Sequence, residues 1–306
     1  MNRLENFKGV IPALLTGFDK EGNYDPKSTK EMVDWLASMN ASGLYITGHT
    51  GHGAVMDRDE RMKVVEDVCA FAKGKMPITA HIAAVSSKNS AEMAEHAEKA
   101  GCIAVSAVPS YYYKLDSKQM YEYYSEIAEA SDLPLIIYAQ TANYTPSVEM
   151  FRKLSEIKNV EGVKYTGMDH YMMGRIKEHL GKDFMVYSGC DEMNLSGMIS
   201  GADAVIGSTY NILPDLNMRA IDNLFKGDIK TAQKELLTAN AILEVMFKYN
   251  LFAALRAGFE FMGVNAGYNP SPFDNLDENA KAEFKKDLQN LKAKSDIESF
   301  ALFDAI

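Results

Sequence analysis

Hydrophobic and polar positions follow two patterns that alternate along the chain. Short runs that are nearly continuous in apolar residues recur at intervals of 18–34 residues from one start to the next, close to the length of one strand–helix unit. A continuous apolar run is typical of a parallel strand covered on both faces, whereas a longer amphipathic stretch is typical of a helix. The pattern predicts eight strands, at residues 9–18, 43–48, 77–84, 102–109, 133–140, 160–167, 184–191 and 202–209.

The stretches between these runs carry helix start and stop signals. Asp25-Pro26 predicts an N-cap followed by proline at the first helical position. Residues 57–74 begin with acidic residues and end with lysine and glycine, the charge order that favours a helix. Eight uninterrupted strand–helix units predict a closed (β/α)₈ TIM barrel over residues 1–225, an α/β fold, and favour it over an open doubly wound sheet. No GxGxxG follows the first run, so a dinucleotide-binding fold loses its main support.

Apolar runs of the strand type stop at about residue 225. Three amphipathic stretches follow, at residues 228–249, 250–263 and 277–295, and they predict three further helices. No linker rich in Pro, Gly or Ser separates them from the barrel. We therefore expect residues 226–306 to form a C-terminal three-helix extension of the same domain.

Charge and cysteine content narrow the setting in which the protein works. The net charge of −10 and the pI near 5.2 disfavour nucleic acid or an anionic membrane surface as partner. Cys69, Cys102 and Cys190 show no CxxC spacing, which disfavours a zinc site or a disulfide framework. The N-terminal apolar run is short and interrupted by acidic residues, and no stretch of about 20 apolar residues is present. We expect a cytoplasmic protein.

The predicted strand ends gather residues suited to one kind of chemistry. In a barrel, functional side chains lie at the C-terminal ends of strands. The sequence places Lys164, Tyr138 and a turn with glycines flanking Thr50 at such ends, without His and carboxylate clusters at metal-ligand spacing. Burial favours the neutral, nucleophilic form of an amine, which forms an iminium with a ketone and draws electrons from the neighbouring C–C bond. These residues predict amine catalysis, with Tyr138 moving protons and the Thr50 turn binding a carboxylate.

Each of these features also has a purely structural interpretation. A lone lysine at a strand end is commonly a surface residue or an ion-pair partner, and Tyr138 also fits a core aromatic residue. The tyrosines at 111–113 are typical of a subunit interface, and "GHTGHG" (48–53) is typical of a tight turn. Four histidines are interpreted as solvated or packed residues without a role: His81, His96, His170 and His179.

The strand-end residues, taken together, resemble the pyruvate-dependent class I aldolases that group N-acetylneuraminate lyase with dihydrodipicolinate synthase. The resemblance runs from "GVIPALLTGFD" (9–19) to the C-terminal helices, and so covers essentially the whole chain. It implies a (β/α)₈ barrel with extra C-terminal helices, usually a homotetramer (a dimer of dimers), and no metal or organic cofactor. It also implies four roles: Schiff-base lysine for Lys164, proton-transferring tyrosine for Tyr138, pyruvate-carboxylate ligand for Thr50, and member of an intersubunit hydroxyl relay for Tyr112.

Two further stretches resemble the lyase branch of this family. "GCDE" (189–192) and "IGSTYN" (206–211) match its G-x-D-E and I-G-S-T-Y-N stretches. Carboxylates accept hydrogen bonds from the vicinal hydroxyls of a sugar acid. The resemblance therefore implies an aldolase-type carbon–carbon lyase that cleaves N-acetylneuraminate (sialic acid) reversibly to N-acetyl-D-mannosamine and pyruvate. It implies that the sugar tail is held by Gly189, Asp191, Glu192, Ser208 and Thr166.

The sequence departs from the family pattern at three places. His49 stands where the family has Ser or Thr, His52 stands where it has Glu, and "YAQT" (138–141) replaces Y-N-x-P. Our hypothesis is that the His49 imidazole replaces the hydroxyl as carboxylate ligand or joins the proton relay, which gives activity an added pH dependence. The alternative is that backbone N–H groups bind the carboxylate and His49 only fills space. Asn143 stands where dihydrodipicolinate synthase has an arginine, which disfavours that enzyme.

Two other functions stay open on the sequence. One is a related class I pyruvate aldolase for another sugar acid or aldehyde, such as a 2-keto-3-deoxy sugar acid, and the other is a non-catalytic barrel that binds a keto acid or sugar acid. Changes at His49 and Ala139 favour these alternatives. Joint retention of Lys164, Tyr138 and "GCDE" favours the enzyme, with a sugar acid and pyruvate as small-molecule partners.

Overall fold

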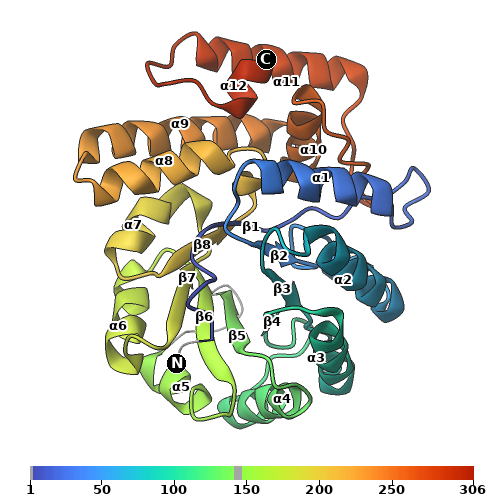
Figure 1. The fold of residues 1–306 in the computed structure, drawn as a ribbon, viewed down its shortest axis with the longest axis vertical. Helices are drawn as coiled ribbons and strands as arrows, with labels where there is room; N and C mark the ends of the chain where they lie inside the picture. The colour runs from blue at the N-terminus through green and yellow to red at the C-terminus, as the bar shows by residue number, and fades with distance from the viewer. Residues whose placement is uncertain (1–2, 141–146) are drawn as a thin grey trace.

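The computed structural model describes residues 3–140 and 147–306, which form a barrel of parallel strands ringed by helices (Figure 1). The strands pair in the order β1-β8-β7-β6-β5-β4-β3-β2. The ring closes between β1 and β2, where Ala13 bridges to Tyr45 and the Leu14 N–H donates to the Tyr45 carbonyl at 2.9 Å. The predicted TIM barrel is confirmed. Its strands are β1 (Gly9–Pro12), β2 (Leu44–Ile46), β3 (Ile78–His81), β4 (Ala104–Ala107), β5 (Leu135–Gln140), β6 (Val160–Thr166), β7 (Met185–Ser188) and β8 (Ala204–Gly207).

Each of the eight strands is shorter than the apolar run that predicted it. The first run continues to residue 18, although β1 ends at Pro12. Leu14, Leu15 and Phe18 are nevertheless almost fully buried, because they pack at the mouth of the barrel after leaving the hydrogen-bonded ladder. An apolar run therefore reports burial, and only part of it reports strand pairing.

Helices alternate with the strands as the sequence predicts. The Asp25 side chain accepts from the Lys27 N–H at 3.0 Å and Pro26 is the first helical residue, so the predicted start of α1 is confirmed. Seven further helices complete the ring of the described residues. The eight are α1 (Pro26–Ser38), α2 (Arg58–Ala72), α3 (Ser87–Ala100), α4 (Ser117–Glu129), α5 (Val148–Leu154), α6 (His170–Leu180), α7 (Asn194–Ile199) and α8 (Pro214–Phe225).

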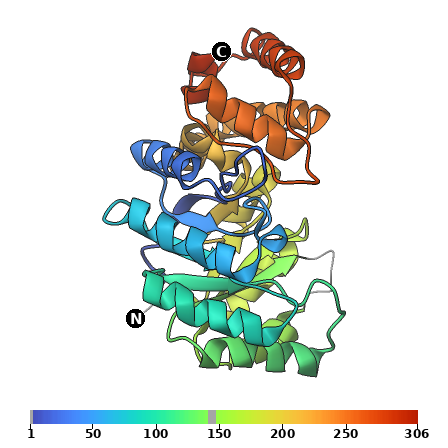
Figure 2. The same cartoon turned by 90° about the vertical axis from the view of Figure 1, so that its right-hand side faces the viewer.

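The C-terminal helices stack beyond α8 and α1 at one end of the molecule (Figures 1 and 2). The three predicted helices are present as α9 (Ile229–Lys248), α10 (Leu251–Phe261) and α11 (Glu278–Lys292). A fourth and shorter helix, α12 (Ala301–Ala305), follows them and was not predicted from the sequence. Five residues are too few to show a helical period, and α12 is held by tertiary contacts: its Leu302 and Phe303 are buried.

The helix α10 ties the C-terminal segment to the barrel. Arg256 is buried, and its guanidinium donates to the Thr16 carbonyl after β1, to Asn269 and to the Ala266 carbonyl. These bonds hold the end of the first strand against the C-terminal helices. No helix within the described ranges is long and apolar enough to cross a membrane.

Candidate active site

Lys164 lies inside the barrel, directly beside Tyr138. The two residues are paired in the register of β5 and β6, so their side chains point the same way. The Lys164 residue is only 6 % exposed, and Nζ lies 4.2 Å from the centroid of the Tyr138 ring and 4.7 Å from that of Tyr45. None of the ion pairs among the described residues includes Lys164. The amine is therefore a buried group against aromatic faces, and not a surface lysine.

The ring of Tyr45 packs against the Lys164 amine. Its hydroxyl hydrogen-bonds the Ser106 hydroxyl at 3.0 Å, which in turn donates to the Ile136 carbonyl at 2.8 Å. Complete burial raises the pKa of Tyr45 well above its usual value, so the phenol stays protonated. Tyr45 and Ser106 were not among the residues predicted from the sequence. Both lie within strands, so a search confined to strand ends passes over them.

The Thr50 turn brings two strand ends together at the barrel mouth. Thr50 is buried, and its hydroxyl lies 2.7 Å from the hydroxyl of Ser208, the residue after β8. The turn needs its glycines, because a Cβ on Gly53 would lie 1.8 Å from the Thr47 carbonyl oxygen. The structure thus brings together Thr50 and Ser208, two residues that sequence reasoning assigned separately to the pyruvate and sugar ends of the substrate.

The two histidines of this turn have different surroundings. His49 is exposed at the mouth, yet the surrounding protein desolvates its imidazole; this desolvation and the charge of Lys164 lower the pKa of His49. His52 is buried, with its ring centroid 4.6 Å from Phe273 and 4.8 Å from Phe252. Burial lowers the pKa of His52 to about 3. Neither ring nitrogen of His52 has a hydrogen-bond partner among the described residues, so it packs as a neutral aromatic ring.

Asp191 lies at the same end of the barrel, after β7. Its Oδ2 accepts from the Thr209 N–H at 2.6 Å. Burial raises the pKa of Asp191 to about 6, although the hydrogen bonds from Thr209 favour the ionised carboxylate and oppose this rise. Because a Cβ on Gly207 would lie 2.0 Å from Asp191 Oδ1, glycine there lets the carboxyl pack against β8.

Gly189 and Thr166 complete this part of the site. A Cβ at Gly189 would lie 2.0 Å from Thr166 Oγ1 and 3.2 Å from Lys164 Cε. The end of β7 therefore passes close over the end of β6 only because residue 189 is glycine. Glu192 is half-buried, and its carbonyl accepts from the Asn240 side chain of α9 at 3.0 Å.

A cavity of about 230 Å³ opens beside Tyr138, lined by His49, His81, Tyr111 and Gln140 among others. His81, interpreted above as having no role, is buried with its ring centroid 5.9 Å from Tyr138. Burial, and then the charge of Arg61, hold the pKa of His81 well below its usual value. His81 is the last residue of β3, so the strand-end rule applied to every polar residue would have included it.

Tyr112 is not part of this cluster. It is 75 % exposed and its ring packs against Tyr113, with 4.9 Å between centroids. Within one chain it is therefore available to a neighbouring molecule. Thr141 of "YAQT" and Asn143, two departures from the family pattern, lie outside the described residues.

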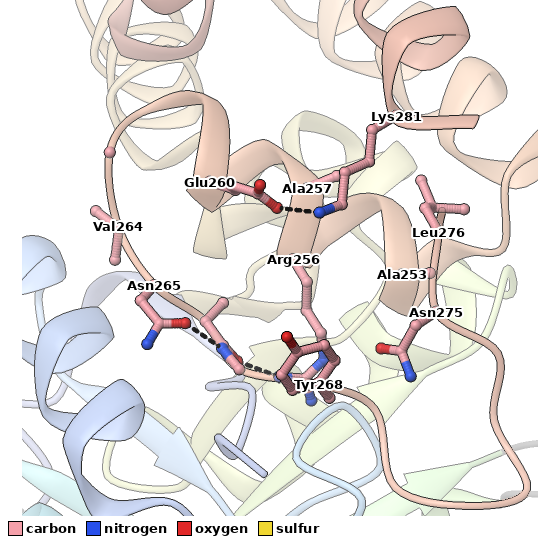
Figure 3. A pocket seen from close by; sticks show the side chains of 13 residues that line it. Ala253, Arg256, Ala257, Glu260, Val264, Asn265, Tyr268, Asn275, Leu276 and Lys281 are labelled. Carbon is pink, nitrogen blue, oxygen red and sulfur yellow. Dashed lines mark hydrogen bonds and ion pairs between the residues drawn. The ribbon is translucent and has the colours of Figure 1, made fainter. Parts of the chain in front are cut away.

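A larger cavity, of about 420 Å³, lies between α10, the segment 262–276 and α11 (Figure 3). Lys281 pairs there with Glu260 at 2.7 Å, and Arg256 lines its wall. None of the residues predicted for catalysis or substrate binding lines it. Within residues 3–140 and 147–306, no three His, Cys, Asp or Glu side chains lie close enough to hold a metal ion.

Comparison with known proteins places the chain in a family. The sequence matches the dihydrodipicolinate synthetase family over residues 6–291. It is 32% identical to an N-acetylneuraminate lyase of Rhizobium meliloti (strain 1021) over 274 residues, 89% of this chain and 91% of the relative. It is 34% identical to an N-acetylneuraminate lyase of Escherichia coli (strain K12 / DH10B) over 291 residues, 94% and 97% of the two chains. The structure of the Ruminococcus gnavus sialic acid aldolase superposes with a TM-score of 0.89 at 27% identity, over 95% of this chain and 99% of the other.

The chain belongs to the dihydrodipicolinate synthetase family. The family predicted from the sequence is thereby confirmed. Both curated relatives are named N-acetylneuraminate lyase. This is the branch of the family that the stretches "GCDE" and "IGSTYN" indicated.

Proposed function

We propose that the chain is a carbon–carbon lyase that cleaves N-acetylneuraminate reversibly to N-acetyl-D-mannosamine and pyruvate. The observation that carries the proposal is the Lys164 amine, buried against Tyr138, with the Asp191 carboxyl at the same mouth. A class I aldolase needs a nucleophilic amine, a proton carrier beside it and a polar wall for the sugar. The full-length similarity to named lyases supports the choice of substrate.

Lys164 performs the covalent step in this proposal. Its Nζ attacks the C2 ketone of the sugar acid, and loss of water leaves an iminium. Tyr138 then takes the proton of the C4 hydroxyl, and the C3–C4 bond breaks as its electrons move toward the iminium nitrogen. This step releases N-acetylmannosamine as the aldehyde. Protonation of the resulting enamine and hydrolysis of the iminium release pyruvate and the free amine.

The binding roles divide between two parts of the mouth. In the turn after β2, Thr50 and the adjacent His49 bind the pyruvate carboxylate, and the 2.7 Å contact from Thr50 to Ser208 supports a shared hydroxyl network. At the ends of β6, β7 and β8, the hydroxylated tail of the sugar acid binds to Thr166, Gly189, Asp191, Glu192 and Ser208. Vicinal hydroxyls are hydrogen-bond donors. A ligand that leaves a buried carboxylate of the site without such a donor binds much more weakly.

Helix α10 supports the proposal that residues 226–306 work as part of the barrel domain. Its Phe252 contacts both His49 and His52, with ring centroids 5.5 and 4.8 Å apart. Its Arg256 holds Thr16. We further infer a homotetramer, a dimer of dimers in the cytoplasm, in which the exposed Tyr112 of one chain reaches the hydroxyl relay of its neighbour. Light scattering and the kcat of Tyr112→Phe test this arrangement.

Trapping with borohydride tests the reaction class. The protein is incubated with pyruvate and borohydride, and the adduct is located by intact mass and peptide mapping. We expect one added carboxyethyl group on the Lys164 amine. This group should be absent from Lys164→Met. It should be retained in Lys158→Met, a matched control at an exposed lysine that pairs with Asp132. No adduct would overturn the amine mechanism and favour a binding protein, whereas an adduct on another lysine would overturn the role of Lys164.

Product analysis tests the substrate separately. Incubation of the protein with N-acetylneuraminate should release N-acetylmannosamine and pyruvate in equal amounts. An adduct on Lys164 without this cleavage, together with turnover of a 2-keto-3-deoxy sugar acid or of pyruvate with aspartate semialdehyde, would assign the chain to a different pyruvate aldolase.

A further inference from the structure

Two cysteines that are remote in sequence meet at the end of the barrel opposite to Lys164. Cys69 lies in the last part of α2, and Cys102 lies between α3 and β4. Their Sγ atoms are 3.5 Å apart. Both precede the strands that they adjoin, β3 and β4, whereas Lys164 lies near the C-terminal end of β6. The pair is therefore separate from the candidate active site.

The backbone holds Cys102 in place on both sides. Gly101 ends α3 in the left-handed conformation, with φ of 97°, and the Cys102 N–H donates to the Ala97 carbonyl at 3.0 Å. The next N–H, of Ile103, donates to the Ile78 carbonyl of β3 at 2.9 Å. A disulfide requires about 2.05 Å between sulfurs, so the two atoms need to approach by about 1.5 Å. Side-chain rotation supplies a movement of this size without unfolding either helix.

The two sulfurs differ in access. Cys69 is half-buried and lines a cavity of about 450 Å³, together with Glu66, Lys73 and Met76 among others. Cys102 is only 5 % exposed. A small oxidant that enters the cavity therefore meets Cys69 first, with Cys102 directly behind it.

The hydrogen bond between the thiols assigns their order of reaction. When the Cys102 S–H donates to Cys69, it stabilises the Cys69 thiolate and lowers the pKa of Cys69. The same hydrogen bond, together with burial, raises the pKa of Cys102. Cys190 contrasts with this pair, because burial raises its pKa to about 11.

We propose that Cys69 and Cys102 form an oxidisable dithiol site that a small hydroperoxide converts to an intramolecular disulfide. The Cys69 thiolate attacks one oxygen of hydrogen peroxide, the O–O bond breaks, and the leaving hydroxide takes up a proton to become water. This step leaves a sulfenic acid on Cys69. Cys102 then loses its proton, its sulfur attacks the Cys69 sulfur, and the S–O bond breaks to release the second water. In total, two thiols lose two electrons and two protons to one peroxide.

The test uses the purified full-length protein and hydrogen peroxide. Equimolar treatment should lower the intact mass by about 2 Da and leave one free thiol of three. A non-reducing peptide map should join the peptides that contain Cys69 and Cys102. A dithiol reductant should restore the original mass and all three thiols.

Variants separate the pair from other oxidation. Cys69→Ala and Cys102→Ser should each abolish the cross-link, whereas Cys190→Ser should retain it. Far-UV circular dichroism verifies that each variant is folded. If Cys69→Ala does not fold, Cys69→Ser replaces it in the test. The proposal is overturned if peroxide adds oxygen to the wild-type protein without a link, if the link includes Cys190, or if the link joins two chains.

Discussion

Replacing Asp191 by asparagine should alter how the stability of the protein depends on pH. Burial raises the pKa of Asp191 from 3.8 to about 6, because the enclosed carboxyl is poorly solvated when ionised. The folded protein therefore retains a proton that the unfolded chain has lost between about pH 4 and pH 6. The stabilisation associated with this proton is complete below about pH 4 and is lost as the pH rises through 6.

The magnitude follows from the two pKa values. At about 1.36 kcal/mol for each pKa unit, the difference between 3.8 and about 6 corresponds to about 3 kcal/mol of unfolding free energy. This is an upper figure, because Asp191 as a whole residue retains some exposed surface. An asparagine side chain accepts from the Thr209 N–H without ionising. The stability of the variant should therefore not fall as the pH rises through 6.

Urea unfolding of the wild-type protein and Asp191→Asn at pH 4, 6 and 8, at one protein concentration, measures this difference. As the pH rises from 4 to 8, the unfolding free energy of the variant should increase by up to about 3 kcal/mol relative to that of the wild type. Asp57→Asn, at an exposed residue with no side-chain cap bond, controls for the loss of one negative charge. A difference between Asp191→Asn and wild type that is the same at all three pH values would refute the reasoning. The same variant should lower kcat/KM for N-acetylneuraminate by about 10-fold to 100-fold, as expected for a lost charged hydrogen-bond partner.

Three further changes test the site. Gly189→Ala should cost about 1–3 kcal/mol in urea unfolding and lower the rate of cleavage, because its Cβ would lie 2.0 Å from Thr166 Oγ1; unchanged stability and rate would contradict the close approach. His52→Phe should remove the acid sensitivity of a buried imidazole: since the folded pKa is about 3, wild type should lose about 2 kcal/mol relative to the variant from pH 8 to pH 5, and parallel curves would count against this. His49→Ser should remove the limb of the pH–kcat/KM profile that His49 produces below its usual pKa; an identical profile would show that His49 only fills space.

Local sequence was sufficient to predict the barrel and the reaction class. Alternating apolar runs and amphipathic stretches depend on which faces are buried, and a (β/α)₈ barrel repeats one such unit eight times. That regularity also brings all strand ends to one mouth, so Lys164 and Tyr138 were predicted to lie together before any contact was known. The short helix α12 was missed because five residues carry no period, and its place depends on buried Leu302 and Phe303.

Packing between remote residues sets the quantities that no local pattern predicted. The raised pKa of Asp191 and the neutral His52 follow from desolvation, which is produced by side chains from other strands and helices. The 3.5 Å approach of Cys69 and Cys102 joins residues whose spacing suggested no pairing. The fold and the amine at the end of the sixth strand could be derived from the amino-acid order alone, because both follow from short-range pattern and barrel topology. The protonation states and contacts required the folded chain, because they depend on distances and burial between segments that are far apart in sequence.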